Sequence, residues 1–137
     1  YEAAKEADSI DSASIDSIYE LQLVSNAAYC HFRSTYLQIR FVRLRNWLSK
    51  QPEQNNHQNN SSVNKLSANK DIINNIISVI DEEIELAKLL YNIIKRDSRI
   101  GYEASNHYYY TDRDLKEKVI NCEYLKKKYR EMLEAGY

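Results

Sequence analysis

The segment 99–110, RIGYEASNHYYY, holds the chain's densest mixture of side chains able to bind a polar ligand. It combines guanidinium, carboxylate, amide and imidazole groups with four tyrosines. Hydrogen-bonding groups beside aromatic faces suit a ligand that has many hydroxyl groups and apolar ring faces, as a sugar has. We therefore expect a carbohydrate site in this segment. Its candidate substrate-binding residues are Arg99, Glu103, Asn106, His107 and Tyr108.

Each group in this segment has an expected role and a structural alternative. In the binding interpretation, Asn106 and His107 hydrogen-bond sugar hydroxyls, a tyrosine stacks on a ring face, and Arg99 holds a sugar carboxylate or Glu103. In the alternative, the tyrosines pack under a loop and the polar groups cap helix ends. The exposure of the tyrosine rings distinguishes the two.

A polar stripe on the first long helical pattern is a second candidate. His31, Ser34, Gln38 and Arg45 recur at helical spacing among apolar residues. Such groups cost free energy when buried unless they are paired or face a cleft. The simplest expectation is a solvated face on which His31 has a hydrogen-bond partner.

Metal and catalytic signatures are missing from the sequence. The acidic run at 81–85 has no histidine three residues after a glutamate, and the three histidines are far apart, so we expect no metal and no cofactor. Glu103 has no identifiable second carboxylate for glycoside hydrolysis, so no catalytic residue is assigned.

Composition predicts an all-α fold. The 137 residues include two glycines and one proline, too few for the many tight turns of a sheet protein. The 19 basic and 20 acidic residues nearly cancel, which argues against a nucleic-acid partner. The sequence has no apolar run long enough for a membrane span.

The elements that would position these groups are three long helices in an antiparallel bundle, plus a short N-terminal helical piece at 1–7. Apolar three-four spacing predicts helices over 15–49, 71–96 and from Thr111 onward. The first has a second apolar stripe at 21, 24, 28, 32, 39 and 42, so we expect it at the centre of the bundle. The Asn/Gln-rich residues 51–66 are expected to form a flexible loop.

Local signals mark the ends of the helices. Gly101 suits a left-handed turn after the second helix, and Gly136 suits the end of the last. Thr111 and Asp114 have the spacing of a capping box. Cys30 and Cys122 fall at core positions and are expected to be buried free thiols.

The chain resembles the helical C-terminal region of large bacterial carbohydrate-active proteins. The resemblance rests on HFRSTYLQIRFVRLRN (31–46), IDEEIELAKLLY (80–91) and DSRIGYEASNHYYYTDRDLKEKVINCEYL (97–125). These runs are similar to the helices that follow the catalytic barrel in α-glucuronidase-like and hexosaminidase-like glycoside hydrolases. The resemblance covers the chain except for the Asn/Gln-rich loop, and RIGYEASNHYYY is its most specific part.

The resemblance implies a single helical domain, 1–137, of a larger secreted or periplasmic protein that degrades polysaccharides. A start at Tyr1 without methionine fits a fragment. Such a domain packs against the catalytic domain of the same chain and contributes a loop to oligosaccharide binding, without being catalytic alone. The competing hypothesis is a structural or protein-interaction bundle with no ligand site of its own.

Overall fold

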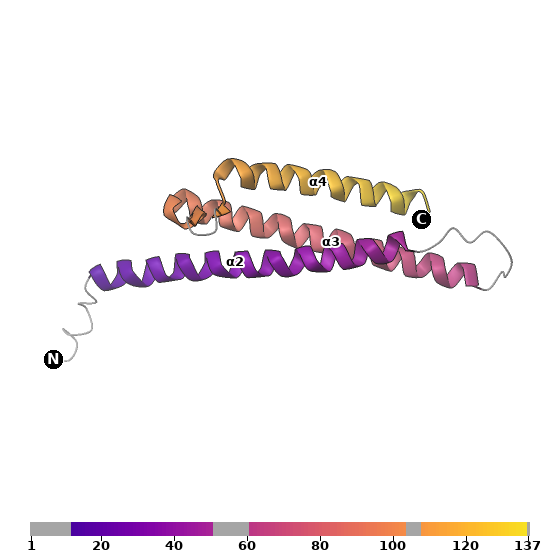
Figure 1. Ribbon diagram of the computed structural model, residues 1–137, viewed down its shortest axis with the longest axis horizontal. Helices are drawn as coiled ribbons and strands as arrows, with labels where there is room; N and C mark the ends of the chain where they lie inside the picture. Colours follow the sequence, from indigo (N-terminus) through magenta and orange to yellow (C-terminus); the bar gives the residue numbers. More distant parts are fainter. Residues whose placement is uncertain (1–11, 51–60, 104–107, 137) are drawn as a thin grey trace, which may run out of the picture.

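The computed structural model describes residues 12–50, 61–103 and 108–136 (Figure 1). Its long helices are α2 (Ser12–Ser49), α3 (Ser61–Arg96) and α4 (Asp112–Glu134). A short connector joins α3 to α4 and contains the 3-10 helix η1 (Ser98–Gly101) and the strands β1 (Tyr102–Glu103) and β2 (Tyr108–Tyr109). The all-α class is confirmed. The expected N-terminal piece at 1–7 lies outside the described residues.

The middle helix of the bundle is α3, and neighbouring helices run in opposite directions (Figure 1). Arg96, at the end of α3, donates to the Tyr19 hydroxyl near the start of α2, whereas Glu83 contacts Ser34 farther along. On the other side of α3, Lys95 pairs with Asp112 at the start of α4. The prediction that the first helix lies at the centre is therefore wrong. The reason is that α2 buries only one of its two apolar stripes, and the second remains exposed.

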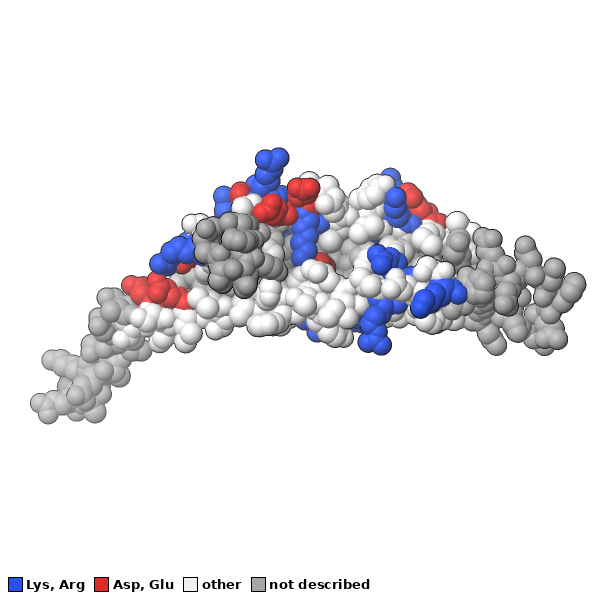
Figure 2. Space-filling view, viewed as in Figure 1, with Lys and Arg blue, Asp and Glu red and all other residues white. Residues whose placement is uncertain are grey.

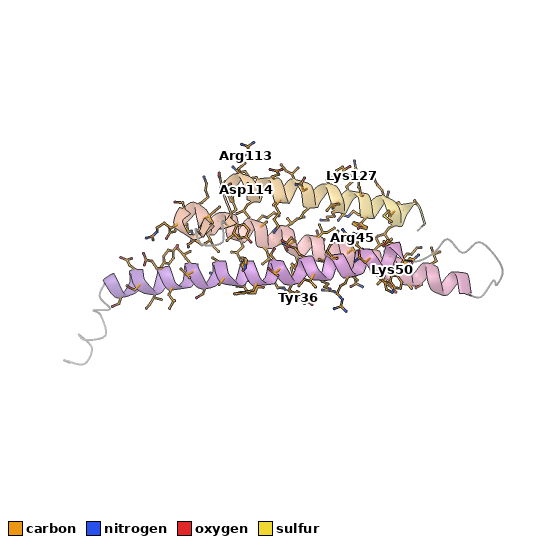
Figure 3. All side chains as sticks on the ribbon, in the orientation of Figure 1. Tyr36, Arg45, Lys50, Arg113, Asp114 and Lys127 are labelled. Atoms are coloured by element: carbon orange, nitrogen blue, oxygen red, sulfur yellow. The ribbon has the colours of Figure 1, made fainter. Side chains whose placement is uncertain are left out.

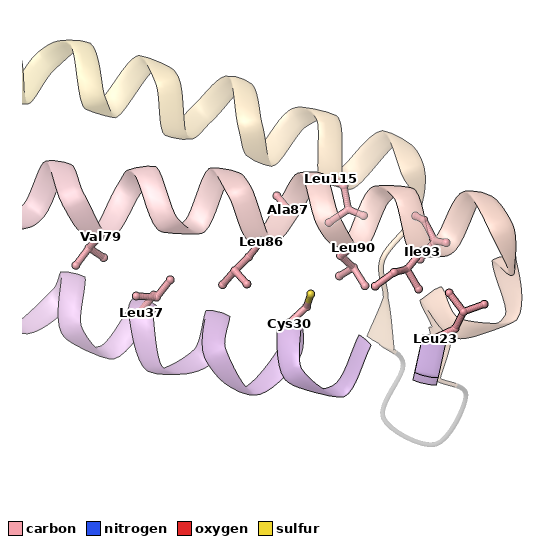
Figure 4. Close-up of a cluster of buried hydrophobic side chains, with 10 residues drawn as sticks. Leu23, Cys30, Leu37, Val79, Leu86, Ala87, Leu90, Ile93 and Leu115 are labelled. Atoms are coloured by element: carbon pink, nitrogen blue, oxygen red, sulfur yellow. The ribbon is translucent and has the colours of Figure 1, made fainter. Parts of the chain in front are cut away.

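The core lies along both sides of α3. Figure 4 shows side chains of α2, α3 and α4 meeting in one apolar cluster. Leu37 and Cys30 of α2 and Leu115 of α4 are each no more than 2% exposed. A second cluster consists of Ile76, Ile80 and Ile84, with residues of α2 and α4 packed against it. Burial of these side chains is the main favourable contribution to folding.

The start of α3 differs from its prediction. The helix begins at Ser61, ten residues before Asp71, so residues 61–66 are helical and do not belong to a loop. Extending a helix that tertiary packing has already nucleated adds one hydrogen bond for each residue fixed, so a polar segment can join it. The remainder of the predicted loop, 51–60, lies outside the described residues.

Helix α4 begins and ends where the capping residues in the sequence predicted. Thr111 and Asp114 form the predicted capping box: the Asp114 N–H donates to Thr111 Oγ1 at 3.2 Å, and the Thr111 N–H donates to Asp114 Oδ2 at 3.0 Å. Figure 3 places Asp114 at the start of the helix. Gly136 follows the last turn with φ of 82°, the left-handed conformation that glycine tolerates best.

Gly101 is needed for a different reason from the one predicted. Among the described glycines, Gly136 has a positive φ and Gly101 does not. A Cβ at Gly101 would lie 2.5 Å from the carbonyl oxygen of Tyr110, whose N–H donates to the Gly101 carbonyl at 2.8 Å. The glycine therefore permits a close approach between the two ends of the connector.

Candidate functional site

The structure describes the five predicted site residues to different extents. The backbones of Glu103 and Tyr108 lie opposite each other in the antiparallel β1–β2 pair, next to the Tyr102–Tyr109 pair. Asn106 and His107 lie outside the described residues. The connector is thus a short hairpin at one end of the bundle (Figure 1). Arg99 is the predicted site residue whose side chain is described.

The side chain of Arg99 is exposed and engaged by a neighbouring carboxylate. Its Nε and Nη2 donate to Asp97 Oδ1 and Oδ2 at 2.8 and 2.6 Å, in the two-pronged geometry that guanidinium favours. Glu20 of α2 lies 3.8 Å away. The hydrogen bonds from Arg99 hold the pKa of Asp97 below its usual value. The Arg99 side chain remains 78% exposed, so the guanidinium is open to solvent on the side away from Asp97.

Tyr110 ends the connector and ties it to α2. Its side chain is half-buried against the core, and its hydroxyl lies 3.2 Å from His31 Nδ1. The two rings meet edge to face, with centroids 6.4 Å apart. Tyr110 is therefore packed against the core, as expected if the tyrosines of the 99–110 segment have a structural role.

Part of the polar stripe of α2 joins side chains of α3 and α4 in a polar cluster, which we call the Glu83 cluster: Ser34, Gln38, Glu83 and Lys118. Ser34 Oγ donates to Glu83 Oε1 at 2.5 Å and accepts from Lys118 Nζ at 3.0 Å and Gln38 Nε2 at 3.2 Å. Lys118 also forms an ion pair with Glu83. Ser34 and Glu83 are 6% and 7% exposed. The expectation of a solvated face is therefore wrong for Ser34, whereas Gln38 and Arg45 are exposed.

Glu83 and Lys118 were not predicted as partners of this stripe. Glu83 had a usable signal, because it occupies a position in the apolar three-four series 76, 79, 83, 86, 90 and 93 of α3. A carboxylate at a core position must find a partner on another element. Lys118 gave no such signal, since it lies among the other charged residues of α4.

A groove of about 290 Å³ lies beside the Glu83 cluster, between α2, α3 and α4. Gln38, Glu83 and Lys118 form its polar part, and its remaining lining is apolar, including Phe41, Val42, Val79, Ile80, Cys122 and Leu125. Both cysteines are free thiols, as expected, although Cys122 is only half-buried. Burial raises the pKa of the Cys122 thiol, which therefore stays protonated at neutral pH and is a poor nucleophile.

The outward side of α2 carries a row of exposed apolar residues, which we call the outer stripe: Leu21, Val24, Ala28, Phe32 and Ile39. Leu21, Phe32 and Ile39 are 67%, 72% and 56% exposed. Tyr36 also points away from α3, with the guanidinium of Arg33 4.9 Å from its ring centroid (Figure 3). The charged side chains seen in Figure 2 leave broad uncharged surface between them.

Neither a metal centre nor a membrane helix is found in the described residues. No group of three or more histidine, cysteine, aspartate or glutamate residues among them is arranged to hold a metal ion. None of the described helices combines the length and apolar character that crossing a membrane requires. Comparisons with protein-family models, curated proteins and solved structures gave no match.

Proposed function

We propose that this chain is an accessory helical domain that packs through the outer stripe of α2 against a larger carbohydrate-processing protein. In this arrangement the 99–110 segment lies at that protein's sugar-binding cleft. The observation that carries the proposal is the exposure of the outer stripe, whose Leu21 and Phe32 are 67% and 72% exposed. Contiguous apolar surface of this kind marks a protein-interaction site.

The geometry of the outer stripe favours a protein partner. From Leu21 to Ile39 the stripe follows one side of a continuous helix and covers about 27 Å at 1.5 Å per residue. Because α3 packs on the opposite side, α2 presents the stripe in a fixed shape. Covering it would gain about 25 cal/mol for each Å² of apolar surface removed from water, before the costs of association.

The carbohydrate part of the proposal is supported by the composition of the 99–110 segment and by its place at one end of the bundle. A protein that docks along α2 passes close to this end, since Glu20 of α2 lies beside Arg99. The open face of Arg99 suits a sugar carboxylate, and Asn106, His107 and a tyrosine supply the remaining contacts. The larger protein is expected in the periplasm or outside the cell, where polysaccharides are degraded.

The sugar contact is tested by NMR titration of the chain with neutral and uronic-acid oligosaccharides. We expect saturable shifts that weaken about tenfold in His107→Ala, the loss typical of one hydrogen bond in a site, without a change in melting temperature. His57→Ala is the matched control, because His57 belongs to the Asn/Gln-rich tract. The carbohydrate part fails if the folded wild-type chain gives no saturable shift with any sugar of the panel.

The packing is tested by Phe32→Glu in the chain alone and in the full-length protein that carries it. In the chain alone we expect no loss of stability, because Phe32 is 72% exposed. In the full-length protein we expect faster protease release of the domain. Ile120→Glu on α4 is the control, with the same chemistry at a residue 67% exposed and outside the outer stripe. Equal protease resistance of the two variants would contradict the packing proposal.

The second candidate function is an interaction bundle without a ligand site. It is favoured by Tyr110, which is packed against the core and beside His31. This function predicts the same result for Phe32→Glu and no response to any sugar, so the two experiments together separate the candidates.

A further inference from the structure

Helices α2 and α4 leave a long groove between them. Both helices pack on α3 and run antiparallel to it, so they run parallel to each other. The 290 Å³ groove beside the Glu83 cluster adjoins a second hollow of about 320 Å³, and Leu125 lines both. We call the two together the α2–α4 groove. Its lining comes from 37–49 of α2 and 118–132 of α4, a length of about 20 Å at 1.5 Å per residue.

The floor of the α2–α4 groove is apolar and partly open to solvent. Leu125 and Val42 are 36% and 41% exposed. The rings of Phe41 and Tyr129 meet edge to face on the floor, with centroids 6.3 Å apart. Met132, whose flexible thioether adapts to different neighbours, is half-buried beside them. An apolar strip of this length gains free energy when a partner removes it from water.

The rim of the groove is basic. Arg45 of α2 and Lys128 of α4 both line the second hollow. Arg45 donates to Asn46 at 3.2 Å, and the Lys128 ammonium lies 4.6 Å from the ring centroid of Tyr124. Neither forms an ion pair with a carboxylate in the part of the chain that the structure describes.

Nearby charges do not cancel this positive rim. At the other end of the groove, Lys118 is already paired with Glu83. Glu131, three residues after Lys128, lies 3.9 Å from Lys127. Figure 3 shows Arg45 on the side of α2 opposite Tyr36. The groove therefore offers two cations without a carboxylate partner beside an apolar floor, which favours an acidic partner.

The shape of the groove favours a helix as its occupant. A shallow apolar strip between two parallel helices is where a further helix packs in a four-helix bundle. An amphipathic helix binds such a groove through apolar side chains spaced three and four residues apart. Four turns of helix, about 14 residues, match the length of about 20 Å.

We infer that the α2–α4 groove binds an acidic amphipathic helix of a partner protein. The apolar side chains of that helix contact Phe41, Leu125 and Met132, and its flanking Asp or Glu residues pair with Arg45 and Lys128. The groove lies on the side of α2 that faces α4, whereas the outer stripe faces away from α3. The inference therefore does not depend on the proposed function.

The test uses two fluorescent helical peptides of about 14 residues each. Both have Leu at the first and fourth positions of two heptads, and the flanking positions are Glu in one and Lys in the other. In fluorescence anisotropy with the whole chain, we expect the Glu peptide to bind about tenfold more tightly than the Lys peptide. This preference should weaken as the salt concentration rises, because salt screens exposed charges.

Charge reversal locates the binding site. The double variant Arg45→Glu with Lys128→Glu should reverse the preference, so that the Lys peptide binds more tightly than the Glu peptide. The control is Arg43→Glu with Lys127→Glu, which makes the same change in net charge at exposed positions of the same helices. Neither of these residues lines the groove, so the control should keep the preference for the Glu peptide.

The apolar floor is tested separately. Leu125→Ala should weaken binding of the Glu peptide several-fold, because its side chain lies in both parts of the groove. Leu89→Ala is its control, since Leu89 is 39% exposed against 36% for Leu125 and does not line the groove. This pair keeps the inference testable if a charge-reversed variant fails to fold, which thermal melting detects.

The results decide the inference in either direction. It is supported if the groove variants, and not their controls, change peptide binding as expected. Equal binding of the two peptides by the wild-type chain, or no binding, would overturn it. Equal losses in both double variants would also overturn it, since the preference would then come from overall charge. Sedimentation that shows a dimer dissociated by Leu125→Ala and not by Leu89→Ala would identify a second copy as the occupant and overturn it as well.

Discussion

At the scale of single residues, hydrogen-bond satisfaction decides which polar groups the bundle can bury. Ser34 is tolerated between α2 and α3 because its hydroxyl has three partners. Glu83 is tolerated because Lys118 supplies the compensating charge, although one of its oxygens is left without a partner among the described residues. Removal of Lys118 would leave the buried carboxylate of Glu83 without its compensating charge, which is strongly destabilising.

The capping box at Thr111 should make the stability of the chain depend on pH in a defined way. Hydrogen bonds from the Thr111 side chain and backbone hold the pKa of Asp114 below its usual value. A carboxylate whose folded pKa is depressed stabilises the fold above its unfolded pKa, and this contribution is lost as the pH falls through the folded pKa. We expect Thr111→Ala to cost about 1 kcal/mol at pH 7. The difference from wild type should shrink below about pH 4.

Urea denaturation between pH 7 and pH 2.5 measures this effect. Thr35→Ala is the control, because the Thr35 hydroxyl donates to the backbone carbonyl of His31, an acceptor that does not titrate. Its difference from wild type should stay constant with pH. A constant difference for Thr111→Ala as well would mean that the box does not set the titration of Asp114.

At the scale of elements, the two apolar stripes of α2 should differ sharply in their energetic value. Leu37 is 1% exposed and packs in the core, whereas Ile39 on the outer stripe is 56% exposed. Leu37→Ala should therefore cost about 3 kcal/mol through lost burial and the cavity that remains, and Ile39→Ala less than about 0.5 kcal/mol. Circular dichroism during urea denaturation gives both values. Similar costs for the two would indicate that the outer stripe is covered in the isolated chain.

Elements were predictable where the deciding interactions are local. Thr111 and Asp114 are three residues apart and meet within one helical turn, so their spacing was sufficient to place the start of α4. The start of α3 was missed because Ser61–Asn69 is polar and joins a helix that is nucleated elsewhere. The position of α2 was missed because apolar spacing shows that a face can be buried without showing what buries it.

The site was less predictable than the fold because its parts come from separate helices. Ser34, Glu83 and Lys118 are brought together by packing, and their sequence separations of 49 and 84 residues exceed any local pattern. The composition of the 99–110 segment was informative about ligand chemistry, and among its predicted binding residues Arg99 is the one whose side-chain contacts are described. Asp97, the partner of Arg99, lies two residues away, so this pair could have been predicted from the local sequence.

At the scale of the whole molecule, stability should be highest in α3 and fall toward the start of α2. Opening α3 would expose both clusters of the core, so its amides should exchange only through global unfolding. Residues 14–22 of α2 are all exposed, and their opening would uncover almost no additional apolar surface. Hydrogen exchange of the isolated chain, followed by mass spectrometry, should therefore show residues 73–94 as the most protected and residues 14–22 as the fastest among the helical peptides.

The experiment is repeated at tenfold lower protein concentration, because association through the outer stripe would protect α2 in a concentration-dependent manner. If residues 14–22 exchange as slowly as residues 73–94 at both concentrations, this part of α2 is covered within a single chain, and the outer stripe is not available to a partner.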